Sequence, residues 1–240
     1  MKTQFSIERQ ECYWNKWQTT TSDSDWHRTR SGRVLQLISE LGLSEDIVAL
    51  DNGCGTGWFT LELAKFSEQA IGIDLTNLAG AQNSDKPQNV EFIHDDFQTF
   101  EFKKKFDLIV SQQVISHVDD QELYIRKNAE LLNPKGYFVV TGNQKFIMNN
   151  LGTVSLPSHL DEGHYENWLS IKKLEKLLSP YFNVVKRTTV VPLGNGGLLR
   201  LVNSYKLGSI LGHLISKERL TELKEKLGFG LFYILVVQKR

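Results

Sequence analysis

The residues best suited to chemistry form a glycine-rich stretch, "VALDNGCGTGWFT" at 48–60. Gly53, Gly55 and Gly57 alternate with other residues directly after a short apolar run, and Asp51 comes two residues before the first of them. Glycines at the start of a helix let the backbone approach a ligand and leave N–H groups available to bind it. A dinucleotide site typically has the spacing G-x-G-x-x-G. The closer spacing here, with a carboxylate that would repel a pyrophosphate, favours a ligand with an ammonium group.

The elements that would position this stretch alternate between strands and helices. Apolar spacing predicts helices at 31–43, 58–66 and 119–132 and strands at 47–51, 70–74, 90–96, 106–111 and 137–142, with a turn at "NPKG". Such alternation is typical of a parallel sheet with helices on both faces. The glycine-rich stretch then occupies the first strand-to-helix turn, and doubly wound sheets bind their ligands near such turns.

The rest of the chain adds a loop and four further elements. Helices are predicted at 169–178 and about 198–227, and strands at 182–191 and 230–240. We therefore expect one domain over 1–240, which divides into an N-terminal aromatic segment at 1–30, a core at 31–142 and a substrate-side part at 143–240.

Composition excludes several classes of protein. The 240 residues include 28 Lys and Arg against 28 Asp and Glu, so net charge gives no attraction to nucleic acid or to an anionic membrane. Two cysteines imply no disulfide framework, and the N-terminus lacks the apolar core of a signal peptide. No apolar run approaches the roughly 20 residues that a membrane helix needs. A cytoplasmic location without integral membrane association is the expectation.

The stretch "VALDNGCGTGWFTLELA" resembles the first motif of the class I S-adenosylmethionine-dependent methyltransferases, a hydrophobic residue followed by D/E-x-G-x-G-x-G. Further landmarks of that family follow in order: "IGIDL", "FIHDDF", "FDLIVSQQVISHV" and "LLNPKGYFVVTG". The closing "GLFYILVVQKR" is similar to the family's antiparallel last strand. The resemblance implies a Rossmann-like, doubly wound α/β fold, with a seven-stranded, mostly parallel sheet, an antiparallel last strand and helices on both faces.

The same resemblance implies S-adenosyl-L-methionine as cofactor, with S-adenosyl-L-homocysteine as product. Asp74 corresponds to the acid that binds the two ribose hydroxyls, with Leu75 beside it. Asp96 is preferred over Asp95 as the acid that binds the adenine amino group, with Phe97 packed on the ring. Asp51 is expected near the methionine amino group. The remaining cofactor residues are Gly53, Cys54, Gly55, Gly57, Ser111 and Gln112. The alternative for Cys54 is a small residue that fills space in the loop, and the alternative for Ser111 and Gln112 is a solvated loop.

Histidines and aromatic residues are the candidates for the acceptor side. His117 lies where relatives that methylate small molecules often have histidine, and it serves either as a catalytic base or as an anchor of its loop. His159 and His164 lie in a loop that crosses the pocket mouth in such relatives, the first as a substrate contact and the second as a base. The aromatic residues Tyr13, Trp14, Trp17 and Trp26 form either a helix packed on the sheet or a lid over the substrate. No metal-ligand spacing stands out.

The expected function is methyl transfer to a hydroxyl or amine of a small molecule, with a hydroxyl preferred. "SQQVISH" lacks the Pro pair of methyltransferases that modify nucleobase amino groups. It looks like the branch that includes ubiquinone-biosynthesis and sugar or natural-product methyltransferases. A non-catalytic module that binds the cofactor and a nicotinamide-dependent oxidoreductase are the alternatives. We expect a monomer or homodimer with no nucleic-acid partner.

Overall fold

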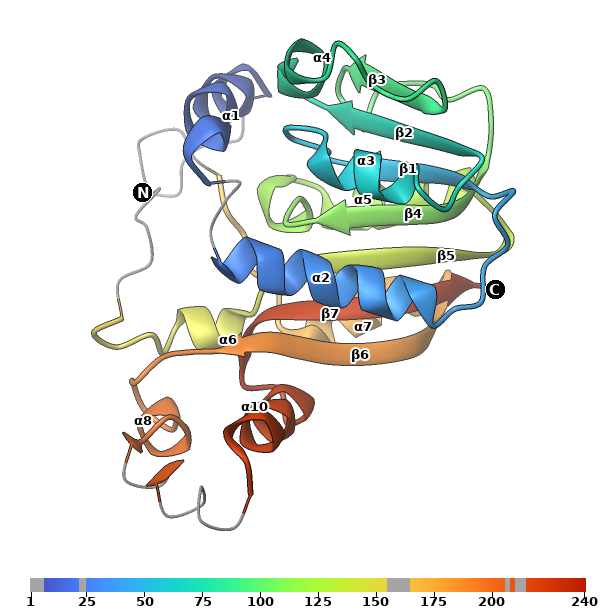
Figure 1. The fold of residues 1–240 in the computed structure, drawn as a ribbon. Coiled ribbons are helices and arrows are strands. Elements are labelled where there is room, and N and C mark those ends of the chain that lie inside the picture. The colour runs from blue at the N-terminus through green and yellow to red at the C-terminus, as the bar shows by residue number, and fades with distance from the viewer. Residues whose placement is uncertain (1–6, 22–24, 155–164, 206–207, 210–214) are drawn as a thin grey trace.

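The computed structural model describes residues 7–21, 25–154, 165–205, 208–209 and 215–240. Within them, the strands are β1 (Val48–Asn52), β2 (Gln69–Asp74), β3 (Val90–His94), β4 (Phe106–Gln112), β5 (Leu132–Asn143), β6 (Phe182–Pro192) and β7 (Gly230–Lys239). They form one sheet in the order β3-β2-β1-β4-β5-β7-β6. Neighbours from β3 to β5 pair in parallel, whereas β7 is antiparallel to both β5 and β6. The predicted Rossmann-like sheet with an antiparallel last strand is confirmed (Figure 1).

Helices cover both faces of this sheet (Figure 1). They are α1 (Ile7–Thr21), α2 (Asp25–Ser39), α3 (Trp58–Leu63), α4 (Leu78–Gln82), α5 (Gln121–Leu131), α6 (Lys145–Met148), α7 (Ile171–Leu178), α8 (Leu199–Val202) and α10 (Lys217–Lys226), with a 3₁₀ turn, η1 (Ile115–His117). Apolar side chains of α2 and α3 pack on one face and those of α5 and α7 on the other. The two layers leave the carboxyl ends of the strands uncovered by these four helices.

Successive residues of the central strands supply the two cores in turn. On β4, Leu108 and Val110 pack toward α2, and Ile109 between them packs toward α5. On β7, Ile234 and Leu235 alternate in the same way. All five are fully buried, because a sheet with helices on both faces excludes water from both sides of its strands. This is why the strands can be recognised in the sequence as nearly continuous apolar runs.

The N-terminal segment is helical, which is one of the two possibilities that the sequence offered for its aromatic residues, and the helix predicted at 31–43 begins earlier. Residues 7–21 form α1, and the next helix, α2, begins at Asp25 and ends at Ser39. The sequence of α1 has little apolar periodicity, so the bounds of this helix were not predicted. In Figure 1, α1 lies beyond the arrowheads of β2 and β4, at the open ends of the strands.

Three smaller differences concern element boundaries. Helix α3 ends at Leu63, three residues earlier than predicted. The expected turn at 133–136 lies inside β5, where Lys135 has a φ of 62° and the pairing with β4 shifts register. The predicted helical stretch at 198–227 contains two separate described helices, α8 and α10, and Ser216 caps the second by accepting from the Arg219 N–H.

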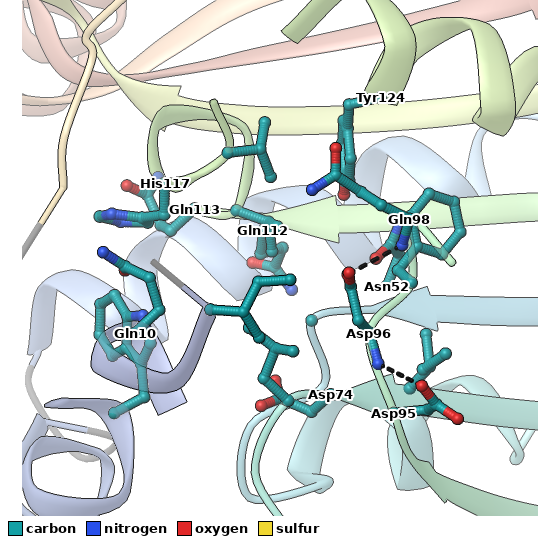
Figure 2. Close-up of a pocket in the computed structure, with 18 residues that line it drawn as sticks. Gln10, Asn52, Asp74, Asp95, Asp96, Gln98, Gln112, Gln113, His117 and Tyr124 are labelled. Carbon is teal, nitrogen blue, oxygen red and sulfur yellow. Dashed lines mark hydrogen bonds between the residues drawn. The ribbon is translucent and has the colours of Figure 1, made fainter. Parts of the chain in front are cut away.

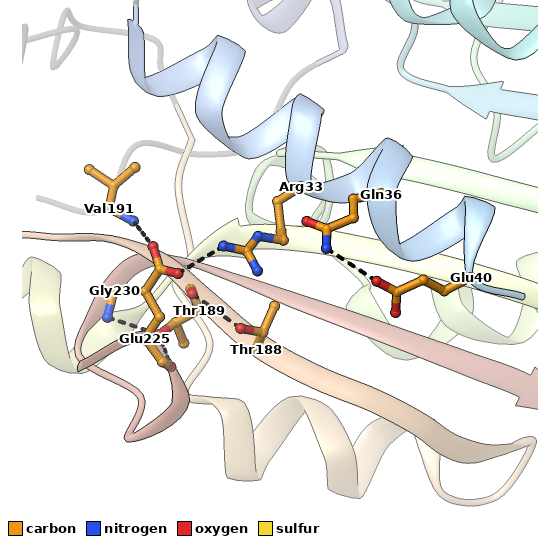
Figure 3. A network of polar contacts seen from close by, with 8 residues as sticks. All are labelled: Arg33, Gln36, Glu40, Thr188, Thr189, Val191, Glu225 and Gly230. Carbon is orange, nitrogen blue, oxygen red and sulfur yellow. Dashed lines mark hydrogen bonds and ion pairs between the residues drawn. The ribbon is translucent and has the colours of Figure 1, made fainter. Parts of the chain in front are cut away.

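A buried ion pair joins α10 to α2 and β6 (Figure 3). The Glu225 carboxylate accepts from Arg33 at 3.2 Å and from the Val191 N–H at 3.3 Å. Val191 has a φ of 61°, a conformation that β-branched residues rarely adopt. Burial raises the pKa of Glu225, and the nearby Arg33 opposes the shift. The contact therefore fixes α10 against the sheet and holds a strained residue at the end of β6.

No helix in the described part of the chain is long and apolar enough to span a membrane.

Candidate functional site

A pocket lies beyond the carboxyl ends of β1, β2 and β4 (Figure 2). Its walls come from α1, the three strand ends, the residues after β3, the turn η1 and α5. Figure 2 shows His117, Gln113 and Gln10 at one end of it, Asp95 and Asp96 at the other, and Gln112 between them. The strand order reverses between β1 and β4, so the pocket occupies the position where doubly wound sheets bind ligands.

The structure brings part of the expected set together in this pocket. Of the residues assigned to the cofactor, the pocket is lined by Gly53, Asp74, Leu75, Asp96, Phe97 and Gln112. Of those assigned to the acceptor, it is lined by His117 and Trp14. Asp51, Cys54, Gly55, Gly57, Ser111 and Tyr13 are not among its lining residues. His159 and His164 lie outside the described residues, as does the side chain of Trp17.

The glycine-rich loop has a backbone that other residues rarely adopt. The φ angles of Gly53, Gly55 and Gly57 are 83°, 54° and 81°. A Cβ at Gly53 would lie 2.1 Å from Cγ2 of Val114, a residue of the loop after β4. The glycine at 53 is therefore required both by its φ and by the close approach of the neighbouring loop.

Asp74 connects the glycine-rich loop to the end of β2. One carboxylate oxygen accepts from the Gly55 N–H at 2.8 Å, and the other accepts from the N–H and hydroxyl of Thr76 at 2.9 and 2.8 Å. Burial raises the pKa of Asp74, and these hydrogen bonds oppose the shift. The oxygen that accepts from Gly55 has a further lone pair, so Asp74 retains the capacity to accept from a ligand in the pocket that it lines.

The two consecutive acids after β3 have different surroundings. Asp95 is exposed, and its carboxylate accepts from the Asp96 N–H at 2.7 Å. The Asp96 carboxylate accepts from the Gln98 N–H at 2.9 Å through one oxygen. Its other oxygen, Oδ2, is buried and has no hydrogen-bond partner among the described residues. A buried carboxylate oxygen without a donor is costly, so this atom is suited to a donor that a ligand supplies.

Asp51 lies beneath the glycine-rich loop, not on the pocket wall. Only 2% of the residue is exposed, and its carboxylate accepts from the Thr60 hydroxyl at 2.7 Å. Burial raises its pKa to about 7. Asp51 is thus not among the lining residues, because its carboxyl group points toward α3 and accepts from Thr60 there.

Ser111 is likewise directed below the pocket. It is fully buried, and its hydroxyl lies 2.8 Å from the Tyr124 hydroxyl. Asn52 donates to Asn128 at 3.2 Å, and Asn128 donates to the Tyr124 carbonyl at 2.8 Å. These side chains form a buried polar network under the pocket, of which Asn52 and Tyr124 reach the wall.

Several carboxamides line the pocket that the sequence did not single out: Gln10, Asn52, Gln98 and Gln113. Gln113 has a φ of 65°, and its N–H donates to the Thr141 carbonyl at 3.2 Å. The second glutamine of "SQQ" follows directly on a predicted strand, so its position was a usable signal. Gln10 had no such signal, because no strand end or motif lies next to it in the sequence.

His117 is held at the wall by the segment before α7. Its Nδ1 lies 3.1 Å from the Tyr165 carbonyl oxygen, and its ring contacts the Trp14 ring edge-on, with centroids 4.9 Å apart. Since a carbonyl only accepts, Nδ1 has the hydrogen, and Nε2 is the unprotonated nitrogen of the neutral ring. His117 therefore anchors its loop and also has the tautomer that a base requires.

In the part of the chain that the structure describes, no three His, Cys, Asp or Glu side chains cluster in a way that would hold a metal ion.

Comparison with known proteins gives matches to methyltransferases. A family model described as a methyltransferase domain matches residues 43–182. The chain is 31% identical over 104 residues to the ubiquinone biosynthesis O-methyltransferase of Rhodopseudomonas palustris strain TIE-1. That match covers 42% of this chain and 41% of the relative, so the chain spans about two fifths of that relative's length.

Two solved structures share the fold over nearly the whole chain. One is the N-methyltransferase NodS from Bradyrhizobium japonicum WM9 in complex with S-adenosyl-L-homocysteine, with a TM-score of 0.65 and 16% identity over 97% of this chain and 98% of that one. The other is an S-adenosylmethionine-dependent methyltransferase from Clostridium acetobutylicum ATCC 824, with a TM-score of 0.65 and 17% identity over 95% and 98%. At these identities the likeness shows the fold alone.

Proposed function

We propose methyl transfer to a small molecule as the function of this chain, which belongs to the class I S-adenosylmethionine-dependent methyltransferases. The family model covers more than half of the 240 residues. The observation on which the proposal depends most is the pocket at the glycine-rich loop, where Asp74 and Asp96 line one cavity with Gly53. The cofactor is S-adenosyl-L-methionine.

The residues of the pocket fit this cofactor. Asp96 Oδ2 has no donor among the described residues. The adenine amino group is a donor and would satisfy this oxygen. Asp74 suits the two ribose hydroxyls, because its carboxylate lines the pocket between the loop and β2. Gly53 permits the close approach of the methionine part, and Leu75 and Phe97 supply apolar surface to the adenosine. Asp51 acts from beneath the loop, where its carboxyl group accepts from the Thr60 hydroxyl.

The chemistry asks mainly for alignment and exclusion of water. When bound, S-adenosylmethionine supplies an activated methyl group, which forms a bond to a nucleophile's lone pair while the carbon–sulfur electron pair returns to sulfur. Trp14 and Gln10 of α1 line the pocket, and we expect them to exclude water from the reacting atoms. His117 Nε2 accepts the proton of a hydroxyl acceptor, and the Tyr165 carbonyl holds the ring in the required tautomer.

We assign the acceptor to small molecules, with a hydroxyl preferred to an amine. The preference is supported by the curated relative, an O-methyltransferase, whereas one fold neighbour is an N-methyltransferase. A nucleobase is not favoured, since "SQQVISH" lacks a proline pair and the chain has equal numbers of acidic and basic residues.

The test is calorimetric titration of the protein with S-adenosyl-L-homocysteine, followed by incubation with S-adenosylmethionine labelled in its methyl group and a cell extract. We expect micromolar or tighter binding and a labelled small molecule that mass spectrometry identifies. Binding without any labelled product would favour a non-catalytic module. Thermal protection by NADH, without binding of S-adenosylhomocysteine, would favour an oxidoreductase.

A further inference from the structure

Arg30 on α2 is a buried guanidinium that has no carboxylate partner among the described residues. Only 7% of it is exposed, and its Nη1 atom has no hydrogen-bond partner in the described chain. The guanidinium lies over the Phe232 ring, 5.1 Å from its centroid, which offsets part of the cost of burial. Buried charges are ordinarily paired, as Glu225 is with Arg33 one turn further along α2. The positive charge of Arg30 therefore acts on its surroundings without an ion pair to any carboxylate in the part of the chain that the structure describes.

Arg30 and Ser31 fix the orientation of Gln112 at the end of β4. Arg30 Nε lies 3.2 Å and Ser31 Oγ 3.0 Å from the same atom, Gln112 Oε1. Because Arg Nε only donates, the atom facing it is the amide oxygen. The amide NH₂ group of Gln112 is then turned away from Arg30, and Gln112 lines the pocket midway between His117 and Asp96 (Figure 2). The wall thus presents an amide donor with a buried cation behind it.

We propose that Arg30, acting through Gln112, is a positioning residue that selects an acceptor reacting as an oxygen anion, an inference that rests on the proposed methyl transfer. An amide donor with a positive charge behind it stabilises an anionic oxygen at the pocket. A hydroxyl acceptor loses its proton to His117 or water, its oxygen forms the bond to the methyl carbon, and the carbon–sulfur pair returns to sulfur. An amine instead becomes cationic as it is methylated, so the charge of Arg30 opposes its reaction.

The other charged and titratable groups around this position are distributed unevenly. Asp74 from β2 and Asp96 after β3 line the adenosine side of the pocket and are held by backbone N–H groups. His117 from η1 lies at the acceptor side, and Tyr124 from α5 is buried beneath, where burial raises its pKa well above the ordinary value. From the segment before α7, Glu166 accepts from the Asn143 amide at 3.1 Å. Two described groups with a positive charge bond to residues of the pocket wall. Arg30 donates to the Gln112 side chain, and Lys127 of α5 donates to the Gln98 carbonyl on the adenosine side.

The test uses 4-nitrophenol, which is colourless when neutral and yellow as the anion. It is titrated with pH in buffer and in the presence of excess wild-type protein saturated with S-adenosylhomocysteine. The variants are Arg30→Met and Arg30→Gln, which replace the charged side chain with an apolar and a polar uncharged one. Since removing an unpaired buried charge relieves a desolvation cost, both are expected to fold. Arg28→Met is the matched control, because Arg28 lies on the same helix with 59% of its side chain exposed.

We expect the bound phenol to ionise about one pH unit lower than in buffer, a tenfold change in the ratio of anion to neutral form. Both Arg30 variants should abolish this shift, and Arg28→Met should retain it, while all three still become saturated with S-adenosylhomocysteine under the conditions of the titration. The proposal is overturned if the phenol does not bind, if its ionisation is unshifted, or if the shift persists in either folded Arg30 variant. Failure of the wild type to bind S-adenosylhomocysteine overturns the proposed function itself.

Discussion

Asp96→Asn is the substitution that most sharply tests which acid binds adenine. Asp96 Oδ1 already accepts from the Gln98 N–H, so asparagine can keep that bond through its oxygen. The group placed at the buried, unpartnered Oδ2 position is then an NH₂. An amide NH₂ and the adenine amino group are both donors, so they cannot form the hydrogen bond that the carboxylate oxygen would accept. Asp95→Asn is the matched control, because Asp95 is exposed and its amide oxygen can still accept from the Asp96 N–H (Figure 2).

The magnitude follows from the kind of hydrogen bond that is lost. A hydrogen bond to a charged group contributes about 1.5–3 kcal/mol, and each 1.4 kcal/mol is a tenfold change in dissociation constant. Calorimetric titration with S-adenosylhomocysteine should therefore give a dissociation constant about ten- to a hundredfold weaker for Asp96→Asn. Asp95→Asn should change it by less than about threefold, as expected for an exposed side chain outside the contact.

A deaminated ligand completes this test. S-inosylhomocysteine has a carbonyl where the adenine amino group stands, so the wild type should bind it more weakly than S-adenosylhomocysteine. Asp96→Asn should lose little or nothing further, because its NH₂ can donate to that carbonyl. Equal affinities of wild type and Asp96→Asn for S-adenosylhomocysteine, or a larger loss in Asp95→Asn, would refute the assignment of Asp96.

Three further predictions concern the loop and the acids around it. Asp74→Asn should weaken S-adenosylhomocysteine binding at least about tenfold, whereas Asp107→Asn, at the opposite end of the sheet, should not; equal losses would contradict the ribose assignment. Gly53→Ala should lower the free energy of unfolding, measured in urea, by about 1–3 kcal/mol, because the new Cβ would lie 2.1 Å from Val114. Gly32→Ala should raise it by about 0.5–1 kcal/mol, because Gly32 lies in a helix and its Cβ would have no other atom within 4 Å. Asp51 has its pKa raised from 3.8 to about 7, so the native state binds the extra proton between these values and stability falls as pH rises. Wild type should lose about 2–3 kcal/mol relative to Asp51→Asn between pH 5 and 7, and parallel curves would rule out the buried neutral acid.

Much of the fold was predictable because burial leaves a direct mark on the sequence. Strands covered on both faces require apolar residues at nearly every position, and β4 and β7 show this plainly. The glycine-rich loop was equally legible, since a positive φ at Gly53 and the contact with Val114 exclude other residues. For the segment that forms α1, the sequence left a helix and a lid as alternatives, because its apolar residues lack a clear helical period.

The directions of side chains and the hydrogen bonds between distant residues could not be predicted from the sequence. Ser111 and Gln112 are adjacent at the end of β4, yet the first points down to Tyr124 and the second lines the pocket. The bond between Arg30 and Gln112 joins residues 82 positions apart, and no local pattern indicates it. Asp51 shows the same limit, because a motif gives its place in the chain but not its partner, Thr60.

The most direct measurement is a crystal structure of the protein with S-adenosylhomocysteine. We predict that both ribose hydroxyls lie within about 3.2 Å of the Asp74 carboxylate, with the adenine amino group at Asp96 Oδ2. A sugar bound elsewhere, or a pocket filled by the protein's own side chains in the presence of saturating ligand, would contradict the assignment of this pocket to the cofactor.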